Sequence, residues 1–89
     1  MQAMLPVLNI SAYRFVAVDD PAALRERLLT RAAASGLKGT VLIAGEGINL
    51  FVAGAEAAVR GFVAMLRDDP RFAELEPRES RSASVPFRR

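Results

Sequence analysis

Apolar and polar residues follow a strand-like pattern over residues 7–18, VLNISAYRFVAV, which are rich in β-branched and aromatic side chains. This segment predicts a strand that ends before Asp19. Asp19, Asp20 and Pro21 then indicate a helix start, because an aspartate side chain caps free N–H groups and proline suits the first helical turn. Two adjacent aspartates could also bind a metal ion, but we interpret them as caps.

Apolar residues spaced three and four apart predict two helices. The first is expected over residues 21–35, where Gly36 ends it as a C-terminal cap. The second is expected over residues 55–67, and Pro70 prevents it from continuing. The buried faces are expected to consist of Leu24, Leu28 and Ala32 in the first helix, and of Val59, Phe62, Val63 and Leu66 in the second.

Two further strands, 38–44 and 48–54, flank a Gly-Glu-Gly turn at 45–47, whose glycines permit the positive φ angles of a tight hairpin. A weaker strand is expected over 72–80, where Pro77 confines it to a sheet edge. The element order predicts an α+β, ferredoxin-like (acylphosphatase-like) βαββαβ sandwich, an antiparallel sheet with both helices on one face. Right-handed crossovers place the first and third strands in its centre.

This topology leaves one face of the sheet open. By alternation, Tyr13 of the first strand and Phe51 of the third point to that open face, with Asn49 beside them. Exposed aromatic rings with neighbouring amides resemble the stacking platforms of single-stranded RNA modules. Alternatively, these residues pack under a neighbouring domain, a partner chain or the C-terminal tail. Asn49 is also expected to satisfy backbone groups near the turn.

The charges are unevenly distributed along the 89-residue chain. Residues 1–70 hold seven basic and seven acidic residues, so the whole formal net charge of +2 comes from residues 71–89. Arg71, Arg78 and Arg81 lie there, and the arginine fork suits phosphate. These arginines are candidate nucleic-acid contacts, and the alternative is an ordinary solvated surface.

The composition also limits the chemistry. The chain has no Cys and no His, so it lacks a thiolate nucleophile, an imidazole base and the usual zinc ligands. Glu46 at the hairpin tip has no acid or base nearby in sequence, so we predict no catalytic residue, cofactor site or metal site. No apolar run approaches the roughly 20 residues that cross a bilayer, and the N-terminus does not resemble a signal peptide, so the expected compartment is the cytoplasm.

Several segments are also similar to one known family. NISAYRF (9–15), LKGTVLIAGEGIN (37–49), VAG (52–54), DPRF (69–72) and ES before PFRR resemble the N-terminal domain of the bacterial rhodanese-related family of tRNA uridine hydroxylases. The usual family text is close to NISAYKF, LKGTILLAEEGINGTVAG and DPRF. The chain departs from it at Gly45, usually Glu, and at Leu50 and Phe51, usually Gly-Thr.

The resemblance implies a cytoplasmic enzyme that uses oxygen to form 5-hydroxyuridine at the wobble position of certain tRNAs. The implied catalytic Cys belongs to a following rhodanese-like domain, so the expected partners are that domain and tRNA. We expect residues 1–81 to form the N-terminal domain, residues 82–89 to be a tail or cut linker, and the rhodanese domain to be absent from this chain.

Three functions remain open at this point. The first is a tRNA-engaging accessory domain with Tyr13, Glu46, Asn49 and Phe51 among its contacts, together with the three arginines. The second is a scaffold that packs on the rhodanese-like domain and touches no RNA. The third is an acylphosphatase-type enzyme. An acylphosphatase cradles phosphate with an Arg in the loop after its first strand, whereas this loop has the sequence VAVDDP and would repel an anion.

Overall fold

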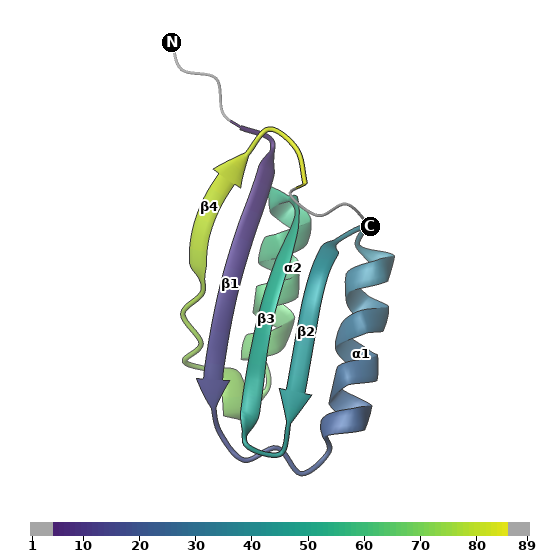
Figure 1. Cartoon of the computed structure of the whole chain (residues 1–89), viewed down its shortest axis with the longest axis vertical. Helices are drawn as coiled ribbons and strands as arrows, with labels where there is room; N and C mark the ends of the chain where they lie inside the picture. The colour runs from purple at the N-terminus through teal and green to yellow at the C-terminus, as the bar shows by residue number, and fades with distance from the viewer. Residues whose placement is uncertain (1–4, 86–89) are drawn as a thin grey trace.

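A four-stranded sheet has β1 (Val7–Phe15) and β3 (Gly47–Ala55) at its centre, β2 (Lys38–Ala44) beside β3 and β4 (Arg78–Ser82) beside β1. Each neighbouring pair of strands is antiparallel (Figure 1). The computed structural model describes residues 5–85 of the chain. The strand order β2-β3-β1-β4 confirms that the first and third strands are central.

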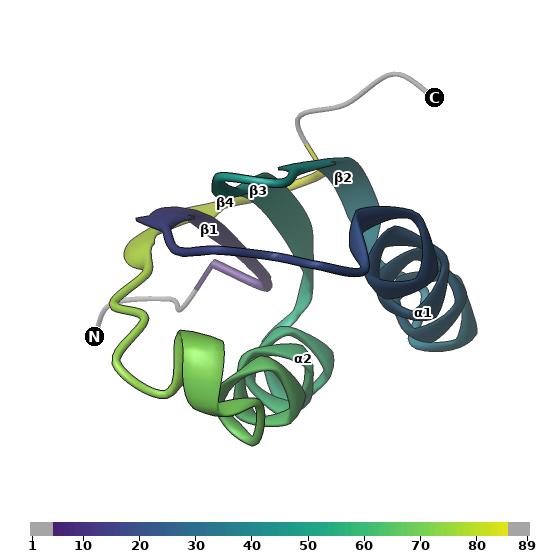
Figure 2. The same ribbon diagram turned by 90° about the horizontal axis from the view of Figure 1, so that it is seen from below.

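Both helices cover the same face of this sheet, and the other face is open (Figure 2). α1 (Pro21–Ala34) connects β1 to β2, while α2 (Glu56–Arg67) and the short 3-10 helix η1 (Pro70–Phe72) connect β3 to β4. This arrangement is the predicted ferredoxin-like fold. The predicted helix faces are buried in the core, which contains Leu24, Leu28, Ala32, Val59, Phe62, Val63 and Leu66 as well as the inward strand residues Leu8, Ile10, Ala12, Ile48, Leu50 and Val52.

The first strand ends three residues before its predicted end. After Phe15 the chain leaves β3 and follows the hairpin turn, where the Val16 N–H donates to the Glu46 carbonyl (3.0 Å) and the Val18 N–H to the Gly45 carbonyl (2.9 Å). Val18 is buried because it packs into the core. Its apolar character therefore reflects packing and not membership of the strand.

The prediction of a strand over 72–80 was wrong in its position. The chain first forms η1, and β4 begins only at Arg78, after Pro77. Phe72 and Leu75 are fully buried in the core. Their apolar side chains are explained by burial in the core and not by strand pairing, and an apolar pattern in the sequence does not distinguish the two.

The two ends of α1 differ in how well the sequence predicted them. Gly36 has φ of +71°, and its N–H donates to the Ala33 carbonyl while the Leu37 N–H donates to the Ala32 carbonyl, so the predicted glycine cap is confirmed. Asp20 occupies the N-cap position, but its side chain makes no capping hydrogen bond. The capping prediction was wrong because Asp20 pairs with arginine side chains instead.

Candidate functional site on the open sheet face

The open face carries large side chains at its hairpin end. The register places Tyr13 opposite Asn49, which itself lies opposite Leu42. Tyr13, Phe15 and Leu42 are 68%, 80% and 60% exposed, respectively. The rings of Tyr13 and Phe15 meet edge to face with centroids 5.7 Å apart. An exposed group of this size marks a contact surface.

Asn49 lies exposed on this face, and its side chain makes no hydrogen bond within residues 5–85. The predicted role of Asn49 in satisfying backbone groups was therefore wrong, because the side chain lies exposed on the open face without a backbone partner in the described residues. The neighbouring hollow of about 370 Å³ is lined by Tyr13, Asn49 and Glu46, among others. Glu46 is exposed at the hairpin tip, as predicted.

The opposite end of the open face is covered. Asn9 and Ala53 lie opposite each other on this face, yet they are only 5% and 0% exposed. The Asn9 side-chain amide donates to the Ser82 hydroxyl (3.1 Å) and to the Ser80 carbonyl (3.4 Å). Phe51 lies between the two ends and is half-buried. The most exposed large side chains that β1 and β3 place on the open face are thus those around Tyr13.

Arg78 and Arg81 of β4 lie on opposite faces of the sheet. Arg78 pairs with Ser11 and shares the open face with Phe51, whereas Arg81 pairs with the inward-facing Leu8. Arg78 has no ion pair within residues 5–85, so its guanidinium is available to a ligand. A hollow of about 660 Å³ extends from Arg78 to Tyr13.

Arg81 takes part in ion pairs on the helix side. It contacts Glu56 of α2 at 3.0 Å, and Arg60 contacts both Glu56 (2.9 Å) and Glu79 (3.0 Å). Hydrogen bonds from Arg60 and Arg81 lower the pKa of Glu56, and those from Arg60 lower the pKa of Glu79. The structure thus places Arg81 away from the open face, in a bridge between β4 and α2.

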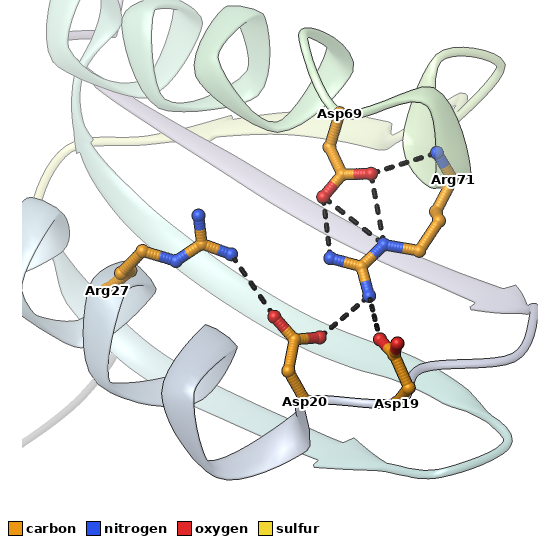
Figure 3. A network of polar contacts seen from close by, with 5 residues as sticks. All are labelled: Asp19, Asp20, Arg27, Asp69 and Arg71. Carbon is orange, nitrogen blue, oxygen red and sulfur yellow. Dashed lines mark hydrogen bonds and ion pairs between the residues drawn. The ribbon is translucent and has the colours of Figure 1, made fainter.

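Arg71 is also occupied by acidic partners (Figure 3). Its guanidinium lies 2.7 Å from Asp69 and 2.8 Å from Asp20, and Asp19 is 3.6 Å away. Hydrogen bonds from Arg71 lower the pKa of Asp69 and of Asp20. Arg71 therefore connects the loop after β1 to η1 through ion pairs. The carboxylates that surround it disfavour an acylphosphatase-type anion site there.

Replacing Arg71 with methionine, which keeps much of the side-chain volume, is expected to lower the free energy of unfolding at pH 7 by about 1–2 kcal/mol through lost charge-assisted hydrogen bonds. Because Asp69 and Asp20 have folded pKa values below their ordinary 3.8, their stabilisation is present above that pH and is lost as the pH falls through the folded values. Urea unfolding measured from pH 7 to pH 2.5 should show that Arg71→Met loses less free energy of unfolding on acidification than the unaltered protein does. An unchanged pH dependence would contradict the network.

The described residues contain no cluster of three or more carboxylates suited to a metal ion. The open face offers stacking, amide and guanidinium groups, which are binding groups and not an acid–base pair. Sequence reasoning missed Phe15 and Leu42 as members of this face. Phe15 follows Tyr13 by two residues in β1, and Leu42 follows Thr40 by two residues in β2. The alternation of side chains along a strand could therefore have placed both on the open face.

The sequence of the chain matches one protein-family model over residues 7–89, that of the UPF0176 acylphosphatase like domain. The chain belongs to this family. A relative from Variovorax paradoxus, named tRNA uridine(34) hydroxylase, is 63% identical over 86 residues, covering 97% of this chain and 33% of the relative. Relatives of the same name from Delftia acidovorans and Bordetella parapertussis are 56% and 55% identical to this chain. Each match covers 97% of this chain, but only 33% of the Delftia relative and 36% of the Bordetella relative.

The UPF0176 chain thus spans about a third of the length of the relatives that it matches. The family match confirms the resemblance expected from the sequence segments. Neither α1 nor α2 is long and apolar enough to cross a membrane, nor is any other helix within residues 5–85.

Proposed function

We propose that this domain is an accessory part of a cytoplasmic tRNA uridine(34) hydroxylase and that it engages tRNA through the open sheet face. The names of the relatives, which cover nearly the whole chain, support the enzyme. The observation that supports tRNA contact is the presence on one face of exposed Tyr13 and of Arg78, which has no ion pair within residues 5–85. In this proposal the oxygen-dependent chemistry belongs to a rhodanese-like domain outside these 89 residues.

Each side chain on the face has a distinct role in this proposal. An unpaired base stacks on Tyr13, since aromatic stacking needs no particular base. The exposed amide of Asn49, directly opposite Tyr13, donates to and accepts from the edge of that base. Arg78 neutralises a phosphate of the same strand, and Phe51 supports the surface between them.

The two arginines of β4 provide a matched test of this proposal. Arg78→Ala is expected to weaken tRNA binding about threefold to tenfold and to reduce the salt dependence by about one counterion. Arg81→Ala removes the same charge from the helix side and should leave binding nearly unchanged. Tyr13→Ala should weaken binding about tenfold through lost stacking. Fluorescence anisotropy with unmodified tRNA at two salt concentrations measures all three.

Equal losses for Arg78→Ala and Arg81→Ala would indicate that only overall charge matters, which would contradict a specific open-face contact. No saturable binding by the unaltered domain, in its folded state, would instead favour the scaffold that touches no RNA. Circular dichroism of each variant separates a lost contact from a lost fold.

A further inference from the structure

We infer that the outer edge of β2 accepts an extended segment of the same enzyme, from outside these 89 residues, as an additional strand. This inference rests on the part of the proposed function that makes the chain one domain of a longer enzyme. It differs from the tRNA contact in using the backbone of a sheet edge, although the hollow beside that edge is also lined by Tyr13 and Asn49.

The two edges of the sheet differ in their protection. β4 is five residues long, follows Pro77 and carries three charged side chains. β2 is seven residues long, KGTVLIA, and its only charged residue is Lys38 at its start. Among the described strands, β2 pairs with β3 alone. Proteins usually protect such an edge with charge, proline or a bulge, so a seven-residue edge with none of these beyond Lys38 is suited to strand addition.

Apolar side chains extend from this edge on both sides of the sheet. Leu42 is 60% exposed on the open face, and Ile43 is half-buried on the helix side. The hollow of about 370 Å³ is lined by Leu42 and Ile43 of β2, and by Arg25 of α1. An added strand alternates its side chains between the two faces, so one set would cover Leu42 and the other would point toward Arg25.

The charges around the hollow define the chemistry of the segment. Arg25 and Glu46 both line it, and neither has an ion pair within residues 5–85. The hollow therefore offers one charge of each sign to an incoming segment. A mainly apolar polypeptide with a carboxylate opposite Arg25 complements it.

A second copy of this chain fits the edge less well. Its own β2 strand has no acidic residue to place opposite Arg25 and would bring only Lys38. The relatives, by contrast, contain about twice as much polypeptide outside the matched region as within it. The charge argument disfavours a second copy, and the length of the remaining polypeptide favours a segment of it as the occupant.

Amide hydrogen exchange of the 89-residue chain and of the full-length enzyme tests the inference without tRNA. The amides of β2 that face away from β3 are expected to exchange at least about tenfold more slowly in the full-length enzyme, while amides of β4 change little. Leu42→Lys should abolish this added protection, because the ammonium would be placed against an apolar strand. Thr30→Lys, at an exposed position of α1, is the matched control and should retain it.

Equal exchange of β2 in both proteins would overturn the inference. Added protection that survives Leu42→Lys would also overturn it. If protection of β2 in the 89-residue chain rose with protein concentration, the occupant would be a second copy, and the inference would likewise be overturned. A failure of tRNA binding leaves these readouts unchanged, so the two proposals can fail separately.

Discussion

Replacing Gly47 with alanine is expected to lower the free energy of unfolding by about 3 kcal/mol or more. Gly47 has φ of +155°, a conformation that side chains disfavour at a cost of roughly 1–3 kcal/mol. A Cβ atom there would overlap the carbonyl oxygen of Arg14 and lie 3.1 Å from Cα of Phe15. Overpacking of this kind costs a further 1–3 kcal/mol or so. Urea unfolding followed by circular dichroism measures the loss.

Two other glycines are controls for this result. Gly45→Ala changes the same turn, but the nearest atom to its Cβ would be the Val18 carbonyl oxygen at 3.8 Å, so stability should change by less than about 0.5 kcal/mol. Gly61→Ala places a methyl group in open space on α2 and should stabilise the protein by up to about 1 kcal/mol. Similar effects at Gly45 and Gly47 would show that β1 does not restrict this turn.

Replacing Phe72 with alanine is expected to cost about 3–5 kcal/mol, the usual range for a fully buried aromatic residue. Phe72 ends η1 and fills the core beneath the sheet, so its removal leaves a cavity under a segment that has no strand pairing of its own. The midpoint of thermal unfolding, measured together with the urea midpoint, reports this loss.

Phe15→Ala is the matched control, because it removes the same side chain from a position that is mostly exposed to solvent. Stability should change by less than about 0.5 kcal/mol in that variant. If both phenylalanines proved equally important, the assignment of Phe72 to the core would be wrong.

The fold could be predicted from local patterns because each pattern reports which side of an element is buried. Alternation placed Tyr13, Asn49 and Phe51 on one face, and spacing of three and four placed Leu28 and Phe62 in the core. These assignments need only the period of the element. The segment between α2 and β4 could not be predicted in this way, since Phe72 and Leu75 are apolar for reasons of tertiary packing.

The candidate site was predictable only in part, because partners distant in sequence decide which charges are free. Arg71 looked available, but Asp20 lies 51 residues before it and binds its guanidinium. Arg81 is likewise held by Glu56, while Arg78 is left on the open face by its register with Ser11. The sequence drew attention to Asn49, which the structure leaves exposed. The structure instead buries Asn9, through an interaction with residues more than 70 positions away.

The pairing of Asn9 with the end of β4 determines where this domain can be joined to other polypeptides. The Ser82 hydroxyl accepts a hydrogen bond from the Asn9 amide and donates one to the Ser84 carbonyl. These bonds link residues 82–84 to β1. A fusion junction placed before Ser82 would remove an acceptor from a buried amide whose carbonyl oxygen already lacks a donor within residues 5–85. Junctions after Ser84 keep this fastening, and domain exchange among relatives should use them.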